Sequence, residues 1–173
     1  MRKLMLSMVV LCALLASGQQ PPKPCTAPEA RQFDFWVGDW EATWPAGGGA
    51  PAGKATNHVV RLMDGCVTQE NFDGRSSNGL VGMSVSSYFA RGGKWKQTWV
   101  DNQGAYMDFV GEFKDGQMVL AREVTNPKGQ KVGQRMVWKN IQPDSFDWSY
   151  EQSSDEGKTW NVVWPIHYTR KKS

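Results

Sequence analysis

Two acidic residues of the chain lie in segments that a barrel would bring together with tryptophans, in an arrangement that suits proton transfer. Glu70 lies in one segment of alternating apolar and polar residues, and Asp101 ends another, residues 95–101 with the sequence WKQTWVD. A carboxyl group that indole rings shield from water has a raised pKa and can exchange a proton near neutral pH. The alternative role is structural, with Glu70 in an internal ion pair with Arg61 or Arg135.

The same segments also suit the binding of a small molecule. Aromatic side chains provide apolar walls, and a few convergent polar groups fix the orientation of a ligand. We expect the following side chains to line an interior pocket: Glu70, Ser84, Tyr88, Trp95, Gln97, Trp99, Arg135 and Trp148. The expected partner is a small apolar or aromatic ligand that carries a polar group. No catalytic residue, metal ligand or cofactor is assigned.

One further motif has a structural interpretation. Residues 153–160, SSDEGKTW, match the Asp-box pattern found on hairpins of sialidases and other secreted β-proteins. We expect Asp155 to accept backbone amides across a tight turn and Trp160 to pack beneath it. The chain has no HExxH, CxxC, GxSxG or phosphate-loop motif, and it has two histidines, so a zinc site built by the protein is not indicated.

The elements that must position these residues are predicted from alternation and turn chemistry. From Asp39 onward, nine clusters of Gly, Pro, Asn and Asp separate ten strand candidates. The linkers are short, which favours antiparallel hairpins over parallel crossovers. An aromatic-rich meander of this length buries its edges by closing on itself. We therefore predict an all-β, up-and-down barrel of about ten strands, preceded by a short helix from Thr26 to about Val37.

Alternation also predicts which side chains share a face. Aromatic and polar residues fall on the same side in several strands, as Trp95, Gln97 and Trp99 do. A barrel with a wet or ligand-filled interior tolerates such mixing better than a sandwich core. Closure would bring the first and last strands together, so that the guanidinium of Arg170 lies on the indole of Trp40.

These motifs resemble those of a known family. Residues 33–40 (FDFWVGDW), Asp64-Gly65-Cys66 followed by Glu70, and residues 95–101 resemble an uncharacterised secreted bacterial family with a lipocalin-like domain, in the calycin superfamily. The resemblance extends from about residue 25 to residue 170. It implies a calycin barrel with a Gly-x-Trp first strand and an Arg on the last strand. It does not imply a particular activity.

Two alternative functions remain open at this point. One is an isomerase-like or hydratase-like enzyme that uses Glu70 or Asp101 as acid and base. The other follows from a fainter resemblance to nitrobindin-like barrels, which implies a haem on His167. Simple alternation places His167 on the solvent side, opposite Trp164 and Ile166, unless a bulge near Pro165 reverses it. A further class is an interaction or envelope-stability module that binds no ligand because its barrel is filled by its own indoles.

The N-terminus and the cysteines predict the compartment. Residues 1–18 combine a cationic start, an apolar stretch and small residues, which is typical of a cleaved signal peptide. Residues 19–25 would form a flexible spacer and residues 26–173 the barrel domain. Cleavage leaves Cys25 and Cys66, which in an oxidising compartment suggests a disulfide, the alternative being two free thiols. We predict a secreted or periplasmic protein.

Net charge and the length of the leader argue against two classes of partner, nucleic acids and membranes. The chain has 20 Lys+Arg and 17 Asp+Glu, and loss of Arg2 and Lys3 with the leader lowers the net charge from +3 to +1. A nucleic-acid surface is therefore not indicated. The leader is too short to span a bilayer, so no stable membrane insertion is expected after its cleavage.

Overall fold

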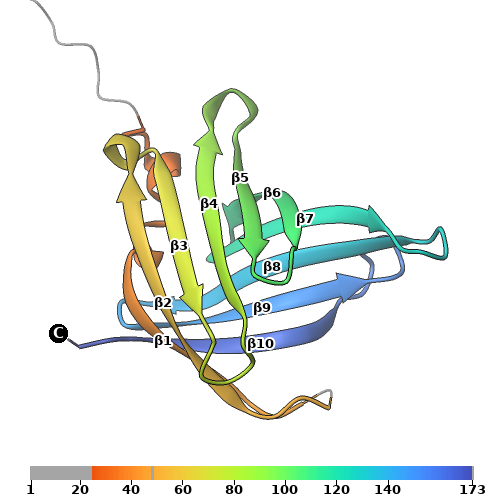
Figure 1. Ribbon diagram of the computed structural model, residues 1–173. Helices are drawn as coiled ribbons and strands as arrows, with labels where there is room; N and C mark the ends of the chain where they lie inside the picture. The colour runs from red at the N-terminus through yellow and green to blue at the C-terminus, as the bar shows by residue number, and fades with distance from the viewer. Residues whose placement is uncertain (1–24, 48, 173) are drawn as a thin grey trace, which may run out of the picture.

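The computed structural model describes residues 25–47 and 49–172, and these form a closed antiparallel barrel (Figure 1). The predicted signal peptide, residues 1–18, and residues 19–24 of the spacer lie outside the described residues and stay predictions. The strands are β1 (Gly38–Trp44), β2 (Gly53–Leu62), β3 (Val67–Asp73), β4 (Val81–Phe89), β5 (Lys94–Asp101), β6 (Tyr106–Lys114), β7 (Gln117–Thr125), β8 (Lys131–Gln142), β9 (Ser145–Ser153) and β10 (Asn161–Arg170).

Each strand pairs with the next along the chain, and β10 pairs with β1 to close the barrel. The nine turn clusters of the sequence coincide with the nine connections, so the predicted up-and-down barrel is confirmed. In Figure 1, β2–β5 and β7–β10 run in clearly different directions, which gives the barrel two curved halves with the core between them. None of the helices that the structure describes is long and apolar enough to span a membrane.

The predicted N-terminal helix consists of two short 3₁₀ helices, η1 (Pro28–Arg31) and η2 (Asp34–Trp36). Helix η1 begins after Ala27 instead of after Thr26, and no side-chain hydrogen bond caps it. Proline explains the shift, because its fixed φ favours the first helical position and its missing N–H needs no partner there. Two more 3₁₀ turns, η3 (Met63–Gly65) and η4 (Ala90–Gly92), lie between β2 and β3 and between β4 and β5.

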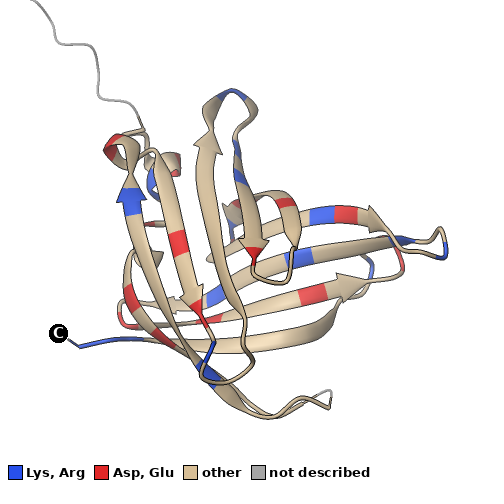
Figure 2. Cartoon of the chain, viewed as in Figure 1, with Lys and Arg blue, Asp and Glu red and all other residues tan. Residues whose placement is uncertain are grey.

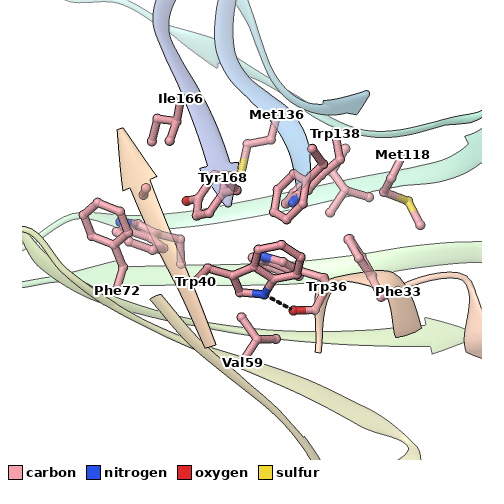
Figure 3. Packing of buried hydrophobic residues seen from close by; sticks show 14 of the residues in the cluster. Phe33, Trp36, Trp40, Val59, Phe72, Met118, Met136, Trp138, Ile166 and Tyr168 are labelled. Carbon is pink, nitrogen blue, oxygen red and sulfur yellow. Dashed lines mark hydrogen bonds between the residues drawn. The ribbon is translucent and has the colours of Figure 1, made fainter. Parts of the chain in front are cut away.

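The two N-terminal 3₁₀ helices close one end of the barrel with aromatic side chains. Phe33 and Trp36 are fully buried, and the Phe33 ring contacts Trp95 and Trp138 edge-on, with centroids 4.8 Å and 5.2 Å away. The indole N–H of Trp40 donates to the carbonyl oxygen of Trp36 at 2.8 Å, as Figure 3 shows. We call Phe33 and Trp36 the aromatic plug.

Barrel closure takes the form predicted from the sequence. Trp40 is paired with Arg170 in the β1–β10 register, and the guanidinium carbon of Arg170 lies 4.1 Å from the centroid of an indole ring of Trp40. The same guanidinium donates to the carbonyl oxygens of Phe35 and Val37. A Cβ at Gly38 would lie 2.3 Å from the guanidinium, so this close approach requires glycine.

The predicted disulfide is also present. Cys25 and Cys66 are bonded and tie the segment before η1 to the segment before β3. Such bonds persist in oxidising compartments.

Candidate functional site

A cavity of about 210 Å³ lies inside the barrel next to the aromatic plug, and Trp138 both lines it and contacts Phe33 and Trp36. Along β5, Trp95 contacts the plug, whereas Trp99 and Asp101 line the cavity. The lining consists mainly of large apolar side chains from six strands (β3, β5, β6, β8, β9 and β10) and the β3–β4 loop. Its members are Glu70, Phe72, Leu80, Trp99, Asp101, Met107, Met136, Trp138, Trp148, Tyr150, Trp164, Ile166 and Tyr168.

Five aromatic rings form a continuous chain of edge contacts along the cavity wall. Their successive ring centroids lie between 5.8 Å and 6.4 Å apart, in the order Trp138, Trp148, Trp164, Phe72 and Trp99. Edge-to-face packing holds each ring in place, and all five rings line the cavity. Phe72, Trp138 and Tyr168 belong to the core drawn in Figure 3.

Trp99 keeps its position because of the glycine opposite it. Gly82 on β4 is the cross-strand neighbour of Asp101, and a Cβ there would lie 2.1 Å from Trp99 Cζ2. The indole therefore packs closely against β4 at Gly82, and this position of the cavity wall depends on residue 82 having no side chain.

Glu70 is the buried acid of the cavity. Strand alternation on β3 directs its side chain inward with those of Thr68 and Phe72. Its Oε1 accepts a hydrogen bond from the Asn57 amide and its Oε2 one from the Ser84 hydroxyl, each at 2.7 Å. Burial raises the pKa of Glu70 to about 7, although the Ser84 and Asn57 hydrogen bonds oppose the rise. The carboxyl group therefore changes protonation state near neutral pH.

Tyr168 extends this polar group from the neighbouring side of the interior. Its hydroxyl accepts a hydrogen bond from the Asn57 amide at 3.4 Å, and its ring stacks on Phe146 with centroids 4.6 Å apart. Burial, together with the nearby charge of Glu70, raises the pKa of Tyr168 well above its usual value. The phenol therefore stays protonated and can donate a hydrogen bond.

Asp101 lies at the end of β5, where it is only partly buried. Burial tends to raise its pKa, but hydrogen bonds from the Trp99 indole and from the backbone amides of Ala105 and Gln103 together lower it. The two carboxyl groups that line the cavity thus have opposite pKa shifts. In the pH range around 7, in which Glu70 changes its protonation state, Asp101 stays ionised.

The structure brings some of the expected pocket residues to the cavity and not others. Glu70, Trp99 and Trp148 line it, and Ser84 binds Glu70 directly. Trp95 and Tyr88 contact each other near the plug, and the Trp95 indole donates to Gln32. Gln97 is buried and donates to Ser86 at 2.9 Å.

Arg135 lies on the outer face, and neither of the ion pairs considered for Glu70 is present. Because β8 directs Met136 and Trp138 inward, Arg135 points outward, where its guanidinium binds the carboxylate of Glu151 at 2.6 Å. Arg61 instead forms an ion pair with Asp34.

The Asp-box turn next to Arg135 has the structural role expected for it. Asp155 accepts the Thr159 backbone amide at 2.9 Å and the Thr159 hydroxyl at 2.7 Å. Backbone and side-chain hydrogen bonds from Thr159, together with one from Ser153, lower the pKa of Asp155 to about 2. Trp160 packs against Gly157, and the Arg135 guanidinium lies 4.1 Å from the Trp160 ring.

His167 faces away from the cavity. A bulge between Val162 and Trp164 precedes it, and its side chain is about half exposed and binds the Asp147 carboxylate at 2.7 Å. The side chains of the described cavity lining include no histidine or cysteine, and the described residues hold no cluster of three or more metal-ligating side chains. The residues that are present do not fit a haem bound through His167.

Sequence reasoning missed most of the wall that β8–β10 provide. Five side chains of these strands line the cavity although none of them was expected to bind a ligand: Met136, Trp138, Tyr150, Trp164 and Tyr168. Alternation from Trp148 along β9 predicts that Tyr150 shares its face, and that signal was available in the sequence.

Comparison with family models and with curated proteins finds no match. No family model matches the chain, and no curated protein matches it. The resemblance to the lipocalin-like family therefore rests on its motifs alone, and the function must be inferred from the cavity.

Proposed function

We propose that the protein is a secreted or periplasmic calycin-like barrel that binds a small, mostly apolar or aromatic molecule in its cavity. The observation that carries the proposal is Glu70, a buried carboxyl group facing a space whose walls, apart from Asp101 at the end of β5, are aromatic and aliphatic side chains. Binding sites of this kind combine an apolar lining with a few polar groups that orient the ligand. The disulfide is consistent with the proposed compartment.

The size of the cavity limits the ligand. An engineered apolar protein cavity of about 150 Å³ binds benzene. A volume of about 210 Å³ thus accommodates one substituted aromatic ring or a compact aliphatic molecule of similar bulk. A porphyrin is far larger than this space, so neither the cavity nor the position of His167 supports the haem alternative.

Tryptophan fluorescence and thermal stability together test the proposal. One-ring aromatic compounds should change the emission and raise the melting temperature, because a ligand that binds only the folded state stabilises it. Native mass spectrometry of the purified protein should detect a co-purified small molecule. Unchanged emission and melting temperature across one-ring aromatics, small aliphatic compounds and hemin would contradict the proposal and favour a barrel filled by its own side chains.

A matched pair of variants links such binding to the cavity. Leu80→Trp introduces an indole into the cavity lining and should abolish the ligand-dependent rise in melting temperature. Val85→Trp introduces the same side chain on the solvent-facing side of β4, where Val85 is exposed, and should leave the rise unchanged. Equal behaviour of the two variants would place the binding site elsewhere.

An acid–base enzyme is the second candidate, and the pKa of Glu70 favours it. A group with a pKa of about 7 can accept and return a proton at neutral pH. Asp101 suits this role less well because its pKa is lowered. If the co-purified molecule is converted by the protein, and Glu70→Gln retains affinity for it but abolishes the conversion, the protein is an enzyme.

A further inference from the structure

The cavity lining carries acidic groups without basic ones. The titratable side chains that face the space are Glu70 on β3, Asp101 on β5, Tyr150 on β9 and Tyr168 on β10. Among the described lining residues there is no lysine, arginine or histidine. When Glu70 ionises, the protein thus places no positive side chain in the cavity to compensate it.

The hydrogen bonds of Glu70 leave room for another donor. A carboxylate has about four acceptor positions on its two oxygens. Asn57 and Ser84 each donate one hydrogen bond, and both donors are neutral. A buried carboxylate is costly to ionise unless a positive group pairs with it. A ligand that brings a positive charge would supply both the missing donor and the missing charge.

The walls favour the same kind of ligand. Five rings follow one another along the cavity wall, and four of them are tryptophans, the residue type that attracts cations most strongly. The negative face of an aromatic ring attracts an ammonium group without needing a hydrogen bond. Asp101 at the end of β5 adds a second negative charge to the lining.

We infer that the cavity selects an organic cation, namely an ammonium group carried on a small apolar body, with the ammonium on Glu70 and the body among the rings. The inference rests on the proposed function and specifies the chemical class of its ligand.

The inference predicts a pH dependence of binding with a definite sign. The ammonium pairs with ionised Glu70, and pH 6 and pH 8 lie one unit below and one above its pKa of about 7. Affinity for an ammonium should therefore rise about tenfold from pH 6 to pH 8. The other charged group of the lining, Asp101, is ionised at both pH values, Tyr168 is protonated at both, and the partners Asn57 and Ser84 do not titrate.

Three probes of similar shape and different charge test the inference by calorimetry: 2-phenylethylammonium, 2-phenylethanol and phenylacetate. At pH 8 the ammonium should bind the wild-type protein at least tenfold more tightly than the alcohol, and phenylacetate should bind most weakly. From pH 8 to pH 6 the preference for the ammonium should fall about tenfold, while the affinity for the alcohol stays constant.

Two variants locate the effect. In Glu70→Gln the ammonium should bind no more tightly than the alcohol, at either pH, while the alcohol retains its wild-type affinity. Glu123→Gln removes a carboxylate from an exposed ion pair with Lys131 on β7 and β8, and should behave as the wild type. Circular dichroism and thermal melting establish that both variants are folded before they are titrated.

The outcomes separate this inference from the proposed function. If the alcohol binds in the cavity and the ammonium binds no more tightly at pH 8, the preference for a cation is overturned and the proposed binding function stands. If neither of these two probes binds the wild-type protein, both fail. If Glu70→Gln keeps the full preference for the ammonium, Glu70 is not the recognition group and the inference is overturned.

Discussion

The chemistry of Glu70 depends on two opposing effects of its surroundings. Burial penalises the charged form, while hydrogen bonds from Ser84 and Asn57 stabilise it, and burial is the larger effect. Both donors are neutral, so neither supplies the full charge that would bring the pKa back to its usual range. The group is thus held close to its titration point at neutral pH.

We expect Glu70 to make folding stability depend on pH. In the folded protein the pKa of the carboxyl group is raised to about 7, whereas the usual pKa of a glutamate side chain is 4.5. The folded state binds more protons between these values, so the free energy of unfolding falls as pH rises through that window. The loss is on the order of 3 kcal/mol for the whole window.

Urea unfolding at several pH values checks this expectation. Glu70→Gln cannot ionise and should gain stability relative to the wild type as pH rises from 4.5 to 8. Glu123→Gln serves as the control for a lost surface charge. If the pH curves of Glu70→Gln and the wild type run parallel, the pKa of Glu70 is not raised in the folded protein.

At the scale of the strands and turns, turn chemistry and alternation predicted most of the structure. The Gly-, Asn- and Asp-rich clusters predicted all nine connections, and alternation predicted the inward side chains of β3 and β5, such as Glu70 and Trp99. These signals are local, because a turn needs particular residues and each strand has a period of two.

The inward face of β8 was harder to predict. In β8, Met136, Val137 and Trp138 are consecutive and apolar, so alternation does not reveal which of them faces inward. Arg135 was expected in the pocket for its chemistry, but Met136 and Trp138 face inward and Glu151 on β9 provides its partner outside. Such a choice depends on contacts between strands, which no single segment contains.

The disulfide is an element-scale feature with a measurable contribution to stability. Cys25 and Cys66 are 41 residues apart, and closing a loop of this length in the unfolded chain contributes about 4 kcal/mol on the chain-entropy model. We expect the variant with both cysteines replaced by alanine to lose about 2–4 kcal/mol in urea unfolding. A reductant should lower wild-type stability similarly and leave the double variant unchanged. Equal stability of oxidised and reduced wild type would contradict this.

At the scale of the whole molecule, charged residues of both signs are dispersed along the strands, without a continuous basic stripe in the view of Figure 2. Closure depends on the contact between the first and last strands. Arg170 lies over the Trp40 ring and donates to the carbonyl oxygens of Phe35, Val37 and Pro143. One side chain thereby joins β10, β1, η2 and the β8–β9 turn.

We expect Arg170→Ala to lower the free energy of unfolding by about 2–4 kcal/mol, because it removes the cation–π contact and leaves carbonyl groups without their donor. Arg170→Lys should recover only part of this loss, since an ammonium group cannot reach all three carbonyl groups in the same plane. Arg91→Ala, at an exposed position in η4, should change stability by less than about 0.5 kcal/mol. Urea unfolding measures all three, and a full recovery by lysine would show that charge alone is required.

If the barrel binds a guest molecule as proposed, the bond between Cys25 and Cys66 also affects how that molecule is retained. It fastens the chain just before the aromatic plug to the chain just before β3, the strand that carries Glu70. The floor beneath a guest would therefore be covalently anchored, and a guest would enter and leave the barrel at the opposite rim, beside Leu80 and Asp101. Cutting the anchor would loosen the floor and open a second exit, so a guest would stay bound for a shorter time although no group that touches it had changed.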